Sequence, residues 1–203
     1  MELHEKTIIR RVSSTHVVRE EDSESRTISG IAVVYRSPQK IYSSYTEEIA
    51  AGCFGKSIEA PHVCALWQHD HSKVLGRVGS STLRLEDRSD GLYFRVVMPK
   101  TTTGDEALEL VQRGDVNECS FAAIVTTTEN KKISDTEYSV KIIEADLLEI
   151  SLVTWPAYSG TSAIGRSYTA TSEDQIMSQL EAEYELRNRT RILDARLDAL
   201  RIL

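Results

Sequence analysis

The sequence predicts a mainly β protein of the α+β class that carries a helix at its C-terminal end. Segments rich in β-branched and aromatic residues recur from Thr7 to about Thr154, as is typical of strands. Residues 172–203 instead contain no Gly or Pro, as is typical of a long helix. With 203 residues, 40% of them hydrophobic, the chain is long enough for one ordinary domain with a core and an appendage.

Five segments carry the strand signals. They are Arg26–Tyr35, Thr82–Glu86, Leu92–Met98, Tyr138–Ile143 and Leu147–Thr154. Gly30 marks a bulge or a close approach of two backbones in the first of these segments. Asp90-Gly91 has the composition of a turn, so the second and third segments are predicted to form a hairpin.

Two short helices are predicted between these strands. They are Phe54–Ala60, which ends before Pro61, and Asp105–Gln112. Thr103 and Glu106 have the spacing of a capping box at the start of the second helix. Gly114 stands where a glycine is favoured just after a helix C-terminus. We therefore expect a β domain with helical turns as additions.

The composition changes after Pro156, and this change defines three parts of the chain. Residues 1–160 form the predicted main domain, residues 161–171 a small, polar linker, and residues 172–203 a helix. The helix opens on a second capping-box spacing and carries apolar residues at three- and four-residue steps. Such a helix either packs on its own domain or forms a short coiled coil or docking segment.

The charge balance and the cysteines restrict the class of protein. The chain has 31 acidic and 24 basic residues, a net charge of −7, which argues against a general nucleic-acid binder. No apolar run is long enough to cross a bilayer, and the first residues show no secretory signal. Three widely spaced cysteines make no disulfide framework. We expect an acidic intracellular protein with neither nucleic-acid nor membrane partners.

The first group of residues that could carry chemistry surrounds His69. Three of the five histidines, His62, His69 and His71, lie within ten positions. On a strand, Trp67, His69 and His71 would share one face, where the imidazoles could act as bases or ligands. With Cys64 they could also hold zinc, but their spacing is not that of structural zinc sites. We therefore predict no metal and no cofactor.

Two further groups could supply a nucleophile and a carboxylate. Ser120 and Cys119 are neighbours on a predicted strand, so they face opposite sides and only one of them can meet a given histidine. Glu149 lies in an apolar run, where a carboxylate is either exposed or paired. From the residues alone, Ser120, His69 and Glu149 are one of several possible combinations.

Nine stretches of the chain, taken in order, carry a resemblance to a known family. They are Ile28–Tyr35, Tyr45–Phe54, Ala65–Asp70, Leu75–Arg77, Gly91–Leu92, Gly104–Asp105, Val111–Asp115, Cys119–Phe121 and Leu148–Tyr158. Together they resemble the tailed-phage prohead (procapsid) maturation serine proteases, which are related to herpesvirus assemblin. The resemblance implies a compact assemblin-like β-barrel ringed by short helices. It also implies a serine endopeptidase inside the prohead, in the host cytoplasm. Its substrates would be the scaffold, or the scaffold-like N-terminal segment of the major capsid protein. The resemblance also implies that the protease cleaves itself and that its copies associate with one another. The alternative is a non-catalytic capsid-assembly or scaffolding module on the same fold.

The same resemblance assigns roles to three residues. His69, in the Trp-x-His-Asp segment, is the implied base, and Ser120, which precedes Phe121, is the implied nucleophile. Glu149 occupies the place of the third member, with Asp70 and His71 as rivals. Gln68 stands where the family commonly has asparagine, a change expected to matter little. Arg77, Arg113 or a backbone N–H are the candidates for stabilising the oxyanion.

Overall fold

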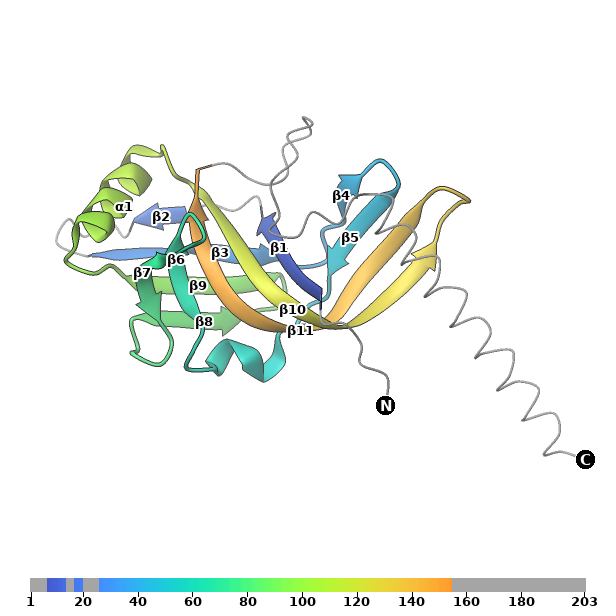
Figure 1. Cartoon of the computed structure of the whole chain (residues 1–203), viewed down its shortest axis with the longest axis horizontal. Coiled ribbons are helices and arrows are strands. Elements are labelled where there is room, and N and C mark those ends of the chain that lie inside the picture. Colours follow the sequence, from blue (N-terminus) through green and yellow to red (C-terminus); the bar gives the residue numbers. More distant parts are fainter. Residues whose placement is uncertain (1–6, 14–16, 20–25, 155–203) are drawn as a thin grey trace, which may run out of the picture.

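The computed structural model describes residues 7–13, 17–19 and 26–154, which form two β-sheets with one 3-10 helix and one α-helix (Figure 1). The first strands are β1 (Thr7–Ser13), β2 (Val17–Arg19), β3 (Thr27–Val34), β4 (Gln39–Tyr42), β5 (Tyr45–Ile49) and β6 (Cys64–Trp67). They are followed by β7 (Asp70–Arg77), β8 (Leu83–Asp87), β9 (Gly91–Val97), β10 (Glu118–Lys132) and β11 (Tyr138–Val153). The helices are η1 (Gly55–Glu59) and α1 (Thr102–Arg113). The prediction of a mainly β fold is confirmed.

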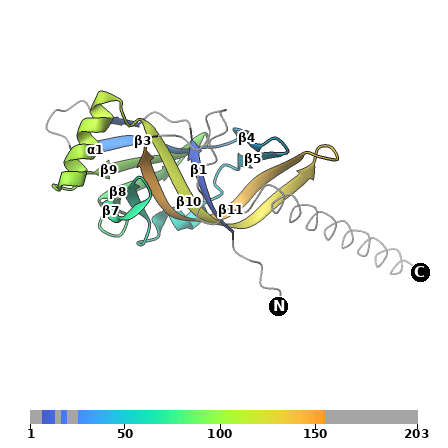
Figure 2. The ribbon, with the colours of Figure 1, turned by 45° about the horizontal axis from the view of Figure 1, so that its top comes forward.

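The larger sheet is organised around the hairpin of β10 and β11. Its strand order is β1-β10-β11-β5-β4, and β6 also pairs with β11 and carries β7 on its other side. Both β5 and β6 run parallel to β11, β5 beside residues 138–142 and β6 beside residues 149–152. Figure 2 shows the hairpin curving away from the rest of the fold, with β4 and β5 beside its far half.

The smaller sheet has the order β2-β3-β9-β8, and all of its pairings are antiparallel. It contains the predicted hairpin around Asp90-Gly91. Neither sheet closes on itself among the described strands. The closed barrel that the resemblance implied is therefore not present in the described part of the chain.

Two of the predicted strands are a single strand in the structure. Residues 138–143 and 147–153 belong to β11, which continues through Glu144, Ala145 and Asp146 and ends one residue before the predicted Thr154. The register of β11 against β10 shifts at several points, including the step from Glu149 to Leu147. Irregularities of this kind let a strand bend without ending. Residues 144–146, which the two predicted strands left out, are thus part of one long curved strand.

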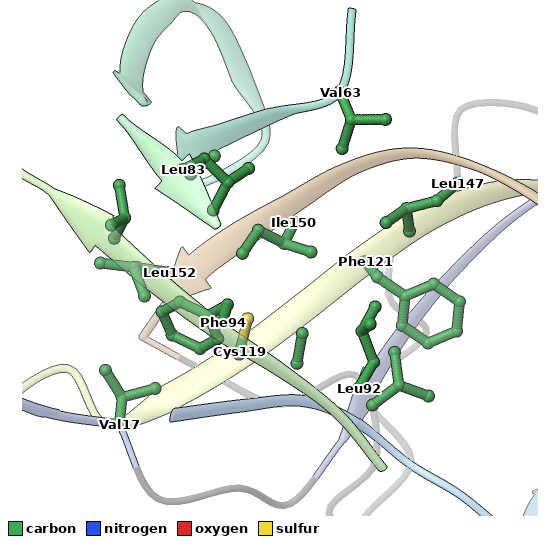
Figure 3. Packing of buried hydrophobic residues seen from close by; sticks show 14 of the residues in the cluster. Val17, Val63, Leu83, Leu92, Phe94, Cys119, Phe121, Leu147, Ile150 and Leu152 are labelled. Carbon is green, nitrogen blue, oxygen red and sulfur yellow. The ribbon is translucent and has the colours of Figure 1, made fainter. Parts of the chain in front are cut away.

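The hydrophobic core takes alternate residues from β10 and β11. Cys119, Phe121, Ile150 and Leu152 pack in one buried cluster with apolar side chains of the smaller sheet, including Phe94 (Figure 3). Successive residues of a strand point to opposite faces. The intervening residues 120, 122, 149 and 151 therefore face the other side of the larger sheet.

Helix α1 begins earlier than its sequence pattern indicated. The side chain of Thr101, not Thr103, caps the N-terminus and accepts a hydrogen bond from the Gly104 N–H at 3.2 Å. Gly114 ends the helix with a φ of 80°, as predicted, and η1 occupies most of the other predicted helix. The predicted linker 161–171 and C-terminal helix 172–203 lie outside the described residues. No helix in the described part is long and apolar enough to span a membrane.

Candidate active site

His69 lies in a tight turn between β6 and β7. Trp67 and Asp70 are paired across these two strands, so Gln68 and His69 are the two loop residues of a hairpin. Their φ angles are 55° and 59°, the left-handed region that two-residue hairpin turns require. The prediction that Trp67, His69 and His71 share one strand face is therefore wrong, because the turn interrupts the alternation. Trp67 is buried in the core, whereas His71 is exposed.

Backbone and side-chain hydrogen bonds hold this turn against the end of β11. The Gln68 N–H donates to the Leu152 carbonyl at 3.0 Å, and the His69 N–H donates to Ser151 Oγ at 3.3 Å. The Gln68 side chain donates from Nε2 to Thr154 Oγ1 at 2.6 Å. Gln68 was expected to matter little, but the structure gives it a direct part in fixing the turn that carries His69.

The side chains of His69 and Glu149 are hydrogen bonded to each other. His69 Nδ1 lies 2.6 Å from Glu149 Oε1, and Glu149 is buried on β11. The second carboxylate oxygen, Oε2, accepts a hydrogen bond from Ser151 Oγ at 2.6 Å. A carboxylate on Nδ1 places the ring proton there and leaves Nε2 free to accept one. This is the arrangement of a general base with its orienting carboxylate.

The rivals of Glu149 have other partners. Asp70 accepts hydrogen bonds from the backbone and the side chain of Ser72, which hold the pKa of the Asp70 carboxyl below its usual value. Lys73 Nζ lies 3.9 Å from the other carboxylate oxygen of Asp70, Oδ2. His71 is exposed on β7. Of the three candidates for the third site residue, Glu149 is the one whose side chain bonds to His69.

Ser120 lies on the same sheet face as Glu149 and Ser151. It is the direct cross-strand partner of Ser151 in β11 and of Val12 in β1. The Ser120 side chain is buried, at 1% exposure, and its hydroxyl donates to the Arg11 carbonyl at 3.0 Å. Within residues 7–13, 17–19 and 26–154, no hydrogen bond joins Ser120 Oγ to His69. The structure therefore places Ser120 opposite Ser151, which bonds to both His69 and Glu149, but turns the Ser120 hydroxyl toward β1.

Cys119, the rival nucleophile, lies inside the hydrophobic core (Figure 3). Its opposite facing from Ser120 confirms the alternation that the sequence predicted. Burial, together with the charge of Glu149, raises the pKa of the Cys119 thiol far above its usual value. Because the thiolate is the reactive form of cysteine, this buried neutral thiol is a poor nucleophile.

The sequence matches a family model described as caudovirus prohead serine protease, over residues 14–175. The chain belongs to this family. The match includes Ser120, His69 and Glu149, and it confirms the resemblance seen in the sequence. The molecule is therefore a prohead serine endopeptidase, a hydrolase of bacteriophage capsid maturation that acts within the prohead in the host cell. Comparisons with curated proteins and with solved structures gave no match.

His62 and Cys64 are the remaining residues that could have held zinc in this prohead protease. His62 is exposed before β6, and Cys64 is buried within β6. Burial raises the pKa of the Cys64 thiol. In the described part of the chain, no three His, Cys, Asp or Glu side chains gather closely enough to hold a metal ion.

The two arginines considered for the oxyanion have partners of their own in the prohead protease. The Arg77 guanidinium donates to the His62 carbonyl at 3.1 Å. Arg113, at the end of α1, pairs with Asp115 at 2.9 Å. Among the contacts of the described residues, none joins Arg77 or Arg113 to Ser120 or His69.

Sequence reasoning missed two features of this site. Ser151 bonds to both His69 and Glu149, and its spacing of two residues from Glu149 on a strand is the signal that could have found it. The Arg11 carbonyl accepts a hydrogen bond from the Ser120 hydroxyl, while the Arg11 guanidinium forms an ion pair with buried Glu47. No sequence pattern points to this second feature, because the pairing of β1 with β10 joins residues far apart in the chain.

Proposed function

We propose that Ser120, His69 and Glu149 form the catalytic triad of this prohead protease. The observation that supports the proposal most directly is the 2.6 Å contact between His69 Nδ1 and Glu149 Oε1. It lies on the sheet face that also carries Ser120. The family defines the reaction as serine-dependent peptide hydrolysis, and these three residue types supply its nucleophile, base and orienting group.

The reaction proceeds by acyl transfer in two stages. Ser120 Oγ attacks the scissile carbonyl carbon while His69 Nε2 takes the hydroxyl proton, and Glu149 stabilises the resulting imidazolium. Collapse of the tetrahedral intermediate breaks the C–N bond, and His69 returns the proton to the leaving amine. Water then attacks the acyl-enzyme with His69 again acting as base, which releases the new carboxylate and restores Ser120.

The Ser120 hydroxyl must change its partner before this reaction. It now donates to the Arg11 carbonyl, and its side chain is 1% exposed. The hydroxyl would have to leave the Arg11 carbonyl on β1 and turn toward His69. Substrate also has to reach a side chain that is closed to solvent. Productive binding therefore includes a movement of the chain around Ser120.

The proposed substrates are scaffold, or the scaffold-like N-terminal segment of the major capsid protein, and the protease itself. An extended segment of such a substrate can pair with the edge of a sheet, in the manner of β-strand addition. Self-association belongs to the same proposal. We also propose that residues 172–203 dock on capsid or scaffold helices and that this segment is afterwards removed by cleavage. Deleting residues 172–203 is expected to abolish incorporation into proheads, and unchanged incorporation would contradict this docking role.

Co-expression with the major capsid protein of the same phage tests the triad. Wild type, Ser120→Ala and Cys119→Ala are compared by mass spectrometry of both chains. We expect defined cleavage sites with wild type and Cys119→Ala, and none with Ser120→Ala. Cleavage that persists in Ser120→Ala but stops in Cys119→Ala would overturn the assignment of the nucleophile. The absence of cleavage in all samples, with scaffold also present, would instead favour a non-catalytic assembly role.

A further inference from the structure

Ser151 lies where the three parts of the site meet. Its hydroxyl donates to Glu149 Oε2 at 2.6 Å and accepts the His69 backbone N–H at 3.3 Å. It is also the direct cross-strand partner of Ser120. The side chain is fully buried, so both of these hydrogen bonds are shielded from water.

The two bonds act on different parts of the His69–Glu149 pair. The bond to Oε2 fixes the rotation of the Glu149 carboxylate, so that Oε1 is directed at His69 Nδ1. The bond from the His69 N–H fixes the backbone of a turn whose two residues have left-handed φ angles of 55° and 59°. Residues in such conformations persist when their surroundings hold them in place. A single hydroxyl thus sets the orienting group and the backbone of the base relative to each other.

We propose that Ser151 is a positioning residue of the protease, which holds His69 and Glu149 in register for proton transfer. This inference rests on the proposed triad. Ser151 itself does not touch the substrate or take the proton. Its donation also disperses the negative charge of Glu149. Without it, the charge left on Glu149 would bind the imidazolium of His69 more strongly.

The variants Ser151→Thr and Ser151→Val form the central comparison. Threonine and valine have the same shape, but only threonine keeps a hydroxyl. Ser151→Ala is a third variant, which keeps the test valid if the β-branched side chains do not fit. Ser57→Ala is the matched control, because Ser57 Oγ also accepts a backbone N–H, that of Leu147 at 3.0 Å, and donates to the Phe54 carbonyl. Thermal unfolding of each full-length variant reports its stability.

A fluorophosphonate probe measures the reactivity of the nucleophile without knowledge of the cleavage sequence. The Ser120 oxygen attacks phosphorus, the P–F bond breaks, fluoride leaves and the hydroxyl proton passes to His69. The labelling rate is followed from about pH 5 to pH 9, the range in which histidine titrates. We expect Ser151→Val and Ser151→Ala to label up to about 100-fold more slowly, since small displacements of catalytic groups have effects of this size. Their acid midpoint should move to higher pH, while Ser151→Thr and Ser57→Ala should keep the wild-type midpoint.

The inference and the triad fail in different ways. Equal loss in the threonine and valine variants would show that packing, not the hydroxyl, matters, and would overturn the positioning role. An acid midpoint that does not rise in the valine and alanine variants would overturn it as well. Labelling of Ser120→Ala at the wild-type rate, lost in Ser151→Ala, would make Ser151 the nucleophile and reject the triad itself.

Discussion

His69 Nδ1 and Glu149 Oε1 lie 2.6 Å apart, although 80 residues separate them in the chain. Glu149 is in register with Cys64 at the start of β6, and His69 lies just beyond the end of the same strand. The turn at Gln68 and His69 reverses the chain direction there. The imidazole is thereby brought back to the buried carboxylate on the neighbouring strand. The proposed base and its proposed orienting group thus come from the turn after β6 and from β11, and β6 and β11 run side by side as parallel strands of one sheet.

The first prediction concerns the charge and the acceptor capacity of Glu149. In Glu149→Gln the amide oxygen can still accept from Ser151, which leaves the amide N–H₂ group facing His69 Nδ1. That contact favours the imidazole tautomer with its proton on Nε2, which cannot accept the proton of Ser120. We expect kcat to fall by about 10⁴-fold with little change in stability. The measurement is cleavage of co-expressed capsid protein, with fluorophosphonate labelling as a second readout.

A matched control for this variant is Glu144→Gln. Glu144 lies on the same strand, is exposed and accepts a hydrogen bond from Thr127 Oγ1 at 2.8 Å. It should keep wild-type activity. If Glu149→Gln retained a tenth or more of the wild-type rate, Glu149 would not be the orienting group.

The second prediction concerns the three free cysteines, all of which are buried. Burial raises the pKa of Cys53 from 9.0 to about 12 and also raises those of Cys64 and Cys119. A thiol whose pKa is higher in the folded protein than in the unfolded protein contributes to the stability of the fold. This contribution is fully present below the pKa of the unfolded protein, near pH 9. It is lost as the pH rises through the pKa of the folded protein. We expect native protein to resist iodoacetamide at pH 8, whereas protein unfolded in guanidinium takes up three labels. Rapid labelling of Cys119 in the native protein, with loss of activity, would instead identify a reactive thiol.

Much of the fold could be predicted because its signals are local. Gly114 ends α1, Asp90-Gly91 turns β8 into β9, and β3 follows its run of β-branched residues. The start of α1 was misplaced because three consecutive threonines can each act as a cap. The structure selects Thr101, whose backbone is extended, and starts the helix at the next residue.

The errors concern features that depend on distant parts of the chain. Gln68-His69 carries no glycine or asparagine to indicate a turn with positive φ, so the strand pattern was continued through it. The predicted strands stopped at Ile143 and resumed at Leu147, but β10 pairs with β11 across this gap. Closure of a barrel depends on pairing between strands far apart in sequence, which no local pattern specifies. Chemistry and family resemblance could pair His69 with Glu149, but they could not orient the Ser120 hydroxyl.

The third prediction concerns Gly104 in the first turn of α1. Alanine is the better helix former, so the substitution would be favourable on helix propensity alone. A Cβ at this position, however, would lie 2.1 Å from the Pro99 carbonyl oxygen, and a backbone atom cannot easily move away. We expect Gly104→Ala to lower the free energy of unfolding by about 1–3 kcal/mol in denaturant titrations. Glu109→Ala, on the exposed face of the same helix, should not be destabilising, and equal stability of the two variants would contradict the steric argument.

The fourth prediction concerns the anchor of the strand that holds the Ser120 hydroxyl. The Arg11 guanidinium binds both carboxylate oxygens of Glu47, at 2.6 and 2.8 Å, and the Tyr45 hydroxyl donates to Oε2 at 2.7 Å. Glu47 is 4% exposed and Arg11 20%, so removing the negative charge leaves a poorly solvated guanidinium. We expect Glu47→Gln to lower the free energy of unfolding by about 3 kcal/mol.

The control for this last variant is Glu86→Gln, which removes the same charge from an exposed pair with Arg88. Water and salt screen such a pair, so its loss should leave the unfolding midpoint unchanged. Denaturant titrations of both variants at low and at high salt separate the two cases. A midpoint for Glu47→Gln equal to that of wild type would show that the Arg11–Glu47 pair does not stabilise β1. The Arg11 carbonyl would then hold the Ser120 hydroxyl through the pairing of β1 with β10 alone.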